Sequence, residues 1–285
     1  MDNKYKEVWT KMEQDQPLPR RMRNQIIINY EDFKKKVLDG DPSFVNEVIK
    51  SLYSGDVYLL KNAFPKEFMA NIKTSLHKHG LSTPSSFHKM LEGCSNFHRI
   101  IDAEVAKNYT FESIKHSYYF FPWNNDPLNI SPETYKRWRI IKYLSGYDFN
   151  QYENNTPKDK VADRIQIVHY PSGSGRIETH CDPHKIQRLI ISCFMTKRGK
   201  DYETGGAYFI DFNNQKVDME NDVEIGDMQI YYPTVMHGVE TINEGTNVNW
   251  NSIRGRWWLG PFTNSTEHEI KRQTGFGVKN LNNLK

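Results

Sequence analysis

The sequence has little cysteine, no long apolar run and almost no excess of charge of one sign. Its three cysteines, Cys94, Cys181 and Cys193, show no Cys-x-x-Cys spacing. A disulfide scaffold is therefore not expected, and we expect the protein in a reducing, cytoplasmic compartment. No apolar run approaches the roughly 18–20 residues that cross a bilayer. Residues 1–30 are charged throughout and lack the apolar region of a signal peptide.

The charge balance is close to neutral. Lysine and arginine number 38 against 35 aspartate and glutamate residues, which gives a net charge of +3. This balance offers no electrostatic reason to expect a nucleic acid or a membrane surface as a partner. Hydrophobic residues make up 37% of the 285 positions and aromatic residues 13%, enough for a sizeable core.

Residues 1–54 predict a helical extension. Tyr5, Val8, Trp9 and Met12 recur at the spacing of one helix face. Two more helices are predicted over residues 30–38 and 43–52. We favour packing of the first face against the core, and a homodimer formed through the N-terminal helices is the alternative.

The next region, residues 55–265, predicts the main domain, and residues 266–285 are taken as a C-terminal tail. A strand over 56–62 enters an amphipathic helix over 65–79, and a further helix is expected over 133–143. The polar, asparagine-rich segment 150–160 is interpreted as a loop that acts as a lid. From residue 164 onward, short strands alternate with turns, which is typical of a sandwich or jelly roll.

Residues 164–182 predict a β-hairpin that ends in His180-x-Asp182. On a strand, residues two apart point to the same face, so one imidazole and one carboxylate project side by side. They supply two ligands of a 2-His-1-carboxylate metal site, and His237 is the best candidate for the third. His184, beside the motif, is the rival of His180, and Asp182-Pro183 could instead only start a turn.

The order of these residues resembles a known family. The pattern begins with His180-x-Asp182. Gly205-Gly206 and Gly226-Asp227 follow, each before an apolar strand, and then come His237 and an arginine on the next strand. This order resembles the Fe(II)/2-oxoglutarate-dependent dioxygenases over about residues 56–262. The layout is similar to the prolyl-hydroxylase-like and phytanoyl-CoA-hydroxylase-like groups. The resemblance implies an α+β fold with a double-stranded β-helix core (a cupin-like jelly roll) flanked by N-terminal helices.

The same resemblance implies an enzyme with Fe(2+) as cofactor and with 2-oxoglutarate and O2 as co-substrates. Its metal ligands would be His180, Asp182 and His237, and it would hydroxylate an unactivated C–H bond with release of succinate and CO2. Because Asp182 is present, hydroxylation or a related oxidation is favoured over halogenation.

An arginine offers a bidentate partner for the free carboxylate of 2-oxoglutarate. The resemblance implies Arg256 in that role, with a tyrosine hydroxyl, from Tyr170, on the same carboxylate. Arg254 lies two residues earlier, shares a face with Arg256 on a regular strand, and stays the rival. The interval from His237 to Arg256 is longer than related patterns show. We interpret it as an inserted loop beside the pocket.

Substrate residues are the least determined part of the site. The aromatic segment 118–126 could line a pocket through Tyr118, Trp123 and Asn124, or pack as a strand beneath a helix. His98, followed by Arg99, is a candidate for meeting an anionic substrate. The aromatic and asparagine-rich segments suit a small polar metabolite.

Two other classes of function stay open. One is a cupin-like protein that binds a metal or a sugar without redox turnover. The other is a structural or interaction protein in which His180, Asp182 and His237 hold no metal.

Overall fold

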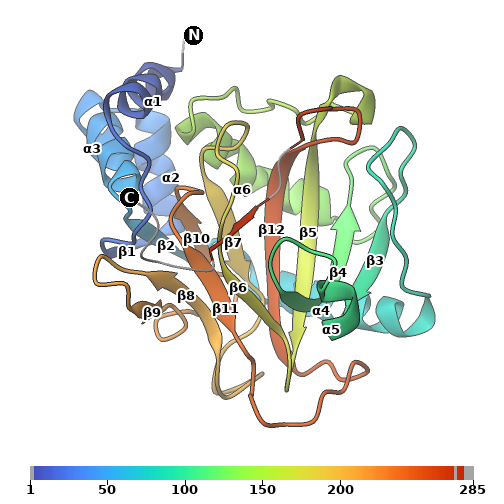
Figure 1. Ribbon diagram of the computed structural model, residues 1–285. Helices are drawn as coiled ribbons and strands as arrows, with labels where there is room; N and C mark the ends of the chain where they lie inside the picture. The colour runs from blue at the N-terminus through green and yellow to red at the C-terminus, as the bar shows by residue number, and fades with distance from the viewer. Residues whose placement is uncertain (1–2, 273–274, 279–285) are drawn as a thin grey trace.

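A computed structural model describes residues 3–272 and 275–278 of the chain (Figure 1). Two facing groups of strands form a curled barrel. One group runs in the order β10 (Met228–Tyr231), β7 (Ile190–Phe194), β12 (Gly255–Ser265) and β5 (Val161–Pro171). The other runs in the order β6 (Arg176–Cys181), β11 (His237–Glu240), β8 (Gly206–Ile210) and β9 (Lys216–Asp218).

Consecutive strands from β5 to β12 alternate between the two groups, apart from β8 and β9, which are neighbours. This alternation is the winding of a double-stranded β-helix, so the predicted fold class is confirmed. Four strands extend the first group: β4 (Ser113–Phe120) with β3 (Phe97–Ile101) beyond β5, and β2 (Val57–Lys61) with β1 (Gln25–Asn29) beyond β10. A short β13 (Phe276–Gly277) pairs with β6.

The predicted hairpin at residues 164–182 is wrong in its pairing. A turn does join β5 to β6, but β5 pairs with β12 and β4, whereas β6 pairs with β11. The turn therefore carries the chain from one sheet to the other. Alternation and turn residues show that two extended segments are joined, and they do not show which strand each segment pairs with.

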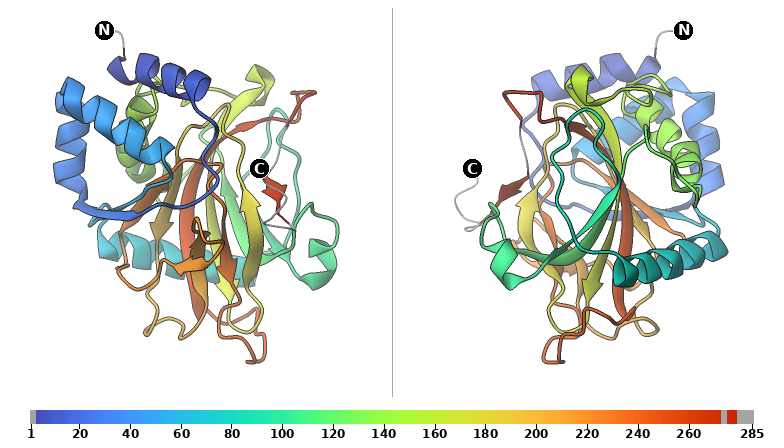
Figure 2. Two further views of the ribbon diagram at one scale, coloured as in Figure 1. Left: turned by 60° about the vertical axis from the view of Figure 1, so that its left-hand side comes forward. Right: turned by 90° about the vertical axis from the view of Figure 1, so that its right-hand side faces the viewer.

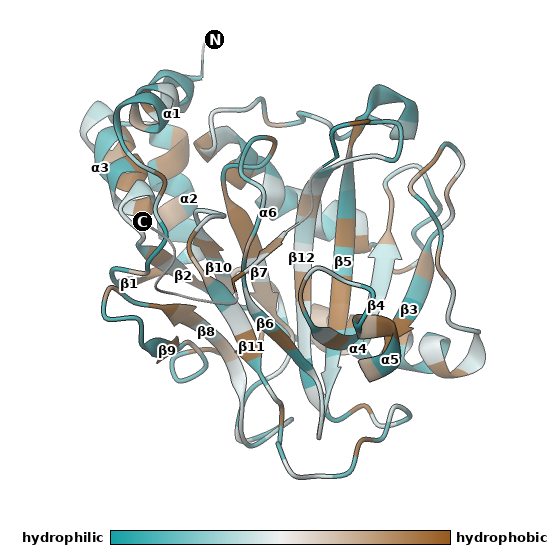
Figure 3. Ribbon diagram, in the orientation of Figure 1, coloured by the Kyte–Doolittle hydropathy of each residue, from teal (hydrophilic) through white to brown (hydrophobic). Residues whose placement is uncertain are grey.

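All the helices except the short α5 lie where the sequence predicts them. They are α1 (Lys4–Asp15), α2 (Tyr30–Asp39), α3 (Pro42–Tyr53), α4 (Lys66–Ser82), the short α5 (Ala103–Ala106) and α6 (Ile130–Leu144). Helices α4 and α6 lie on one side of the barrel (Figure 2). Helices α1 and α3 are banded in hydrophilic and hydrophobic colours, as expected of helices with one buried face (Figure 3). Loop 150–160 ends in a 3₁₀ turn, η1 (Pro157–Asp159).

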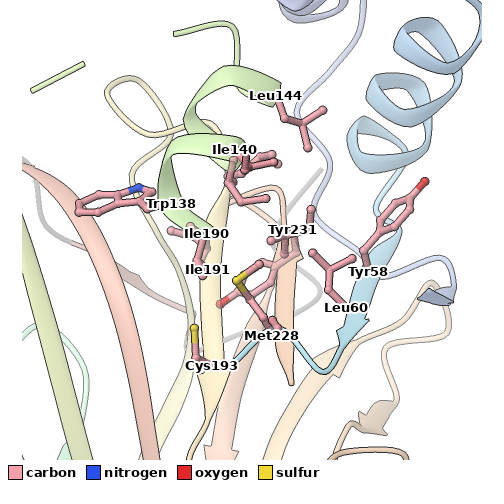
Figure 4. Packing of buried hydrophobic residues seen from close by; sticks show 14 of the residues in the cluster. Tyr58, Leu60, Trp138, Ile140, Leu144, Ile190, Ile191, Cys193, Met228 and Tyr231 are labelled. Atoms are coloured by element: carbon pink, nitrogen blue, oxygen red, sulfur yellow. The ribbon is translucent and has the colours of Figure 1, made fainter. Parts of the chain in front are cut away.

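The N-terminal helices and α6 pack with strand residues in one hydrophobic core. Ile140 and Leu144 of α6 pack near strand residues such as Ile191 (Figure 4). Tyr5 and Trp9 of α1 are fully buried in the same core, and Trp9 Nε1 donates a hydrogen bond to the carbonyl of Leu144 at 2.7 Å. The face of α1 considered for a homodimer contact is thus buried within the chain itself.

The predicted division at residue 54 falls inside this shared core and stays a prediction. The predicted tail, residues 266–285, lies partly outside the described residues. Within the described part of the chain, no helix combines the length and the apolar character that a bilayer crossing requires.

Substitution of Trp9 tests whether α1 is part of the folding unit. Trp9→Ala removes a fully buried indole and its hydrogen bond. We expect the free energy of unfolding to fall by about 3–5 kcal/mol in urea denaturation followed by circular dichroism. Lys11→Ala, at an exposed position of the same helix, should change it by less than about 0.5 kcal/mol. An unchanged transition in Trp9→Ala would show that α1 adds nothing to the stability of the barrel.

Candidate metal centre

Two paired strands bring the two histidines together. Strands β6 and β11 run antiparallel with His180 opposite His237, and the ring centroids lie 4.3 Å apart. Asp182 follows the last residue of β6, and its backbone N–H donates to the carbonyl of Pro233 at 2.9 Å. One ligand atom from each of His180, Asp182 and His237 lies within 4.8 Å of the others. The structure therefore brings together the three residues predicted as metal ligands.

The backbone fixes which nitrogen of each imidazole is free. Nδ1 of His180 lies 2.8 Å from the carbonyl of Glu178, and Nδ1 of His237 lies 2.9 Å from the carbonyl of Val235. A carbonyl only accepts, so both Nδ1 atoms carry the proton and both Nε2 lone pairs are left for a metal. The Nε2 atoms lie 3.9 and 3.4 Å from the carboxylate oxygens of Asp182.

The protonation states also suit a metal site. Burial and the neighbouring His237 together lower the pKa of His180 to about 4, so His180 is neutral at pH 7. Burial alone would raise the pKa of Asp182, but contact with His237 and the proximity of His180 and Lys115 hold it below its usual value. Two imidazoles with free Nε2 atoms and one carboxylate fit a divalent iron ion and leave other coordination positions open.

The triad lies in the wall of a cavity of about 640 Å³. Alternate residues of the strands line this cavity, among them Tyr170 on β5, Gln229 on β10 and Arg256 on β12. The buried Nε2 atom of Gln229 has no hydrogen-bond partner among the described residues. Arg256 is opposite Tyr170 in the β12–β5 pair, and its guanidinium lies 5.8 Å from the centre of the Tyr170 ring.

Arg256 is held by a carboxylate that the sequence does not reveal. Its side chain is only 3% exposed, and Nε donates to Oε1 of Glu220 at 2.7 Å. Glu220 also accepts from the hydroxyl of Tyr202 at 2.7 Å and from the backbone N–H of Ala207 at 2.8 Å. In the described part of the chain, the two terminal NH2 groups of Arg256 have no hydrogen-bond partner. Glu220 thus orients the guanidinium and leaves an edge of it for a ligand.

The charge of Arg256 is secured by this contact. Burial tends to lower the pKa of Arg256, but Glu220, Tyr202 and Tyr170 outweigh burial and raise it above its ordinary value. Gly206 makes room for Glu220: its φ is +127°, and a Cβ there would lie 2.4 Å from Cγ of Glu220. The Gly205-Gly206 pair in the sequence signals a close approach, and it does not show which side chain approaches.

Arg254 does not share the cavity face with Arg256. It precedes β12, where the backbone is not a regular strand, and its exposed side chain lies 3.6 Å from Glu203. His184, the rival of His180, lies outside the three-residue cluster found in the described part of the chain, and its ring is 6.1 Å from that of Tyr232.

The residues expected to contact substrate lie away from the cavity. Trp123 Nε1 and Asn124 Nδ2 donate to the carbonyl of Cys94 at 2.8 and 2.9 Å. Tyr118 stacks on Trp257 at 5.9 Å, and a Cβ on Gly80 of α4 would lie 2.3 Å from its hydroxyl. His98 lies 2.8 Å from His116. Residues 118–120 thus end strand β4 beneath α4, as in the second interpretation, whereas Trp123 and Asn124 lie in the turn that follows.

Comparisons with known proteins give structural likeness alone. No protein-family model matches the chain, and no curated protein matches it. Among solved structures, a Pseudomonas putida prolyl-4-hydroxylase is similar at 10% identity over 76% of this chain and 96% of that one, with a TM-score of 0.47. A full-length Neurospora crassa protein in complex with alpha-KG and thymine is similar at 15% identity over 89% and 93%, with a TM-score of 0.49. A Trichoplax adhaerens prolyl hydroxylase in complex with a hypoxia inducible factor peptide fragment is similar at 11% identity over 86% and 98%, with a TM-score of 0.48.

The strand order of this chain and its three converging ligands stand independently of those comparisons. Consecutive strands wind as a double-stranded β-helix, and the metal-ligand set lies in the wall of its cavity. In fold and in ligand set, the chain has the features of the Fe(II)/2-oxoglutarate-dependent oxygenases, the family that its sequence resembles.

Proposed function

We propose that the chain is a non-haem Fe(II)- and 2-oxoglutarate-dependent oxygenase. It hydroxylates an unactivated C–H bond of a small polar molecule and releases succinate and CO2. The observation that carries this proposal is the convergence of two free imidazole Nε2 atoms and one carboxylate on one point of the cavity wall. The buried Cys94, Cys181 and Cys193 are free thiols, which accords with a reducing, cytoplasmic compartment.

In this proposal His180, Asp182 and His237 hold the iron. When bound, the iron supplies the activation of O2, coupled to the oxidative decarboxylation of 2-oxoglutarate. The hydrogen bonds from Nδ1 to backbone carbonyls keep both imidazoles in position. The ring of Phe111 stacks on His180 at 4.7 Å and shields one side of the site from water.

Arg256 and Tyr170 bind the far carboxylate of 2-oxoglutarate in this proposal. Arg256 offers its terminal NH2 groups, because Nε is already used by Glu220. Burial raises the pKa of Tyr170 to about 12, so its hydroxyl keeps the proton and can donate it in a hydrogen bond at neutral pH. Arg254 is the weaker candidate, because it is exposed and already faces Glu203.

An anaerobic titration tests the proposed metal and co-substrate. Fe(II) followed by 2-oxoglutarate should give a weak visible charge-transfer absorption, because the 2-oxo acid chelates the metal. The absorption should be lost in His237→Ala and retained in His184→Ala, the matched control outside the cluster. Iron binding without this absorption would mean that 2-oxoglutarate is not the co-substrate. It would favour a metal-binding protein without redox turnover.

Succinate release tests turnover directly. With iron, 2-oxoglutarate and O2, the unaltered chain should release succinate, and His180→Ala and Asp182→Ala should reduce release to background, because each removes a metal ligand. Substantial succinate from either variant would contradict the assignment of these residues as ligands.

Glu220→Gln removes the negative charge of Glu220 and keeps a side chain of nearly the same shape. The amide oxygen can still accept from Arg256 and Ala207, but the buried guanidinium loses its counter-ion. Without ligand, we expect a loss of stability of about 3–5 kcal/mol. Added 2-oxoglutarate should then raise the melting temperature more than it does in the unaltered chain, because the ligand replaces the missing charge.

Glu203→Gln is the control for this variant. It removes the exposed partner of Arg254, and the effect should be within about 1 kcal/mol. An equal 2-oxoglutarate shift in Glu220→Gln and in the unaltered chain would mean that Arg256 does not face the co-substrate.

A further inference from the structure

Strand β12 presents two aromatic side chains to the cavity. Trp258 and Phe262 line it, two residues before and two after Gly260, and their ring centres lie 5.8 Å apart. A Cβ on Gly260 would lie 2.2 Å from Cη2 of Trp258 and 3.1 Å from Cε2 of Phe262. Both rings therefore lean over the glycine, and Trp258 Nε1 donates a hydrogen bond to Ser192 Oγ on β7. We call Trp258, Gly260 and Phe262 the aromatic strip.

A guanidinium borders the aromatic strip. Arg164 on β5 is opposite Phe262 on the adjacent β12 (Figure 1), and its guanidinium lies 5.7 Å from the centre of that ring. The guanidinium also lies 5.2 Å from the ring centre of Tyr119, and Nη2 donates to Oε1 of Gln166 at 3.1 Å. Its Nε–H group is buried and has no hydrogen-bond partner among the described residues. These contacts hold Arg164 beside the strip and leave it donors for a ligand.

Arg164 also lacks a counter-ion. Arg164 and Lys115 are half-buried, line the cavity and form no ion pair in the described part of the chain. The two lie apart along the strands, because His116 is opposite His169, which places Lys115 towards Tyr170 at the other end of β5. Arg164 is thus the unmatched cation beside the strip.

Two amides lie at the edges of the strip. Asn264 follows the strip on the same face of β12, and Gln229 on β10 is opposite Ser192, the residue that binds Trp258. Their buried amide nitrogens have no hydrogen-bond partner within the described ranges. An amide can turn to present a donor or an acceptor, whereas a guanidinium only donates. A ligand on the strip therefore needs an oxygen acceptor at Arg164, and the amides can adapt to its other edges.

The strip lies apart from the proposed site for the far carboxylate of 2-oxoglutarate. In the β5–β12 pair, Arg256 is opposite Tyr170 and Arg164 is opposite Phe262. The two arginines are thus six residues apart along the strands, or about 20 Å. Glu220 holds Arg256 at its end, and the contact with the Phe262 ring holds Arg164 at the other. The five-carbon chain of 2-oxoglutarate is no longer than about two extended residues, or roughly 7 Å. A molecule bound at Arg256 therefore does not reach Arg164.

The strip faces the metal ligands across the cavity. The N–H of Gly175 donates to the carbonyl of Pro171 at 2.8 Å and closes the turn that joins β5 to β6. Counted from this closed turn, His180 lies five residues along β6 and Gln166 five residues back along β5, so the two lie at similar heights in the two sheets. Gly260 is opposite Gln166 in the β5–β12 pair. Because the two sheets face each other, a molecule on the strip lies across the cavity from the metal ligands.

We propose that the aromatic strip and Arg164 form the binding surface for the primary substrate, which is a small compound with a flat ring and an oxygen acceptor at its edge. The ring lies against Trp258 and Phe262, and the oxygen accepts from Arg164. Two aromatic walls favour a rigid ring over a flexible chain, because a chain loses rotational freedom when it binds. The proposal rests on the proposed oxygenase function for the reaction alone. Binding does not depend on that function, since none of these residues is a metal ligand.

Neutral probes test this surface independently of the charge at the metal site. Acetophenone and ethylbenzene share one carbon skeleton, and only acetophenone carries an oxygen acceptor. NMR titrations of the metal-free chain, and of the chain with Zn(II) and 2-oxoglutarate, should show acetophenone binding about tenfold more tightly than ethylbenzene. It should also bind more tightly than 2-octanone, a ketone with the same number of carbons and no ring. With Zn(II) present, tighter binding of benzoate than of acetophenone would identify the acceptor as a carboxylate, and otherwise it is a neutral carbonyl.

Variants separate the oxygen from the ring. Arg164→Gln should weaken acetophenone about tenfold and leave ethylbenzene unchanged, because only the ketone uses the guanidinium. Trp258→Ala should weaken both by a similar factor, and Gly260→Ala should do the same by displacing the indole. Two controls should change neither: Lys185→Gln at the exposed cavity edge, and Phe212→Ala at an exposed aromatic position. A thermal melt of each variant checks that it folds.

Other outcomes would overturn the proposal. These are equal binding of acetophenone and ethylbenzene, tighter binding of 2-octanone, and a loss of 2-oxoglutarate affinity in Arg164→Gln that Arg256→Gln does not show. In the last case Arg164 would serve the co-substrate. Ring binding that depends on Trp258, in a chain that shows no iron–2-oxoglutarate absorption, would support the surface and reject the oxygenase. The reverse result would keep the oxygenase and reject the surface.

Discussion

The pairing of β6 with β11 is the contact on which the site depends. It sets His180 opposite His237, and the register of the two strands shifts between His237 and Val239. Each imidazole is bound through Nδ1 to a carbonyl two residues earlier on its own chain segment. The backbone therefore determines where both Nε2 atoms point before any metal arrives. A site built this way binds a metal without first ordering its ligands.

Side chains along β5 alternate between the hydrophobic core and the cavity. Ile165 and Ile167 face outward into the core beneath the helices, whereas Arg164, Gln166 and Tyr170 line the cavity. β12 follows the same rule, with Trp257 and Leu259 in the core and Arg256 and Trp258 on the cavity side. Because the period is two, a substitution at one of these positions acts on the core or on the cavity, and a shift of register by one residue would destroy both.

The sequence predicts the part of the site that depends on order and spacing. His180-x-Asp182 and His237 are recognisable because two ligands share one strand end and the third follows a strand of its own. Composition is a poorer guide. Trp123 and Asn124 have the aromatic and polar side chains that a pocket requires, but composition does not show which way a side chain points. Both donate instead to the backbone carbonyl of Cys94. Glu220 could not be found from the sequence, because it lies 36 residues from Arg256 and only folding brings the two together. The near-neutral net charge likewise hides the unmatched Lys115 and Arg164, since a sum over the chain does not show which cations have partners.

The cations of the cavity therefore divide into two kinds with different effects. Arg256 adds almost no net charge, because Glu220 cancels it, so it contributes direction and hydrogen-bond donors. Lys115 and Arg164 add net charge, and that charge acts on Asp182 and His180 through Lys115. The direction of donors at Arg256 and the net charge at Lys115 and Arg164 are then separate properties, and each can change without loss of the metal ligands.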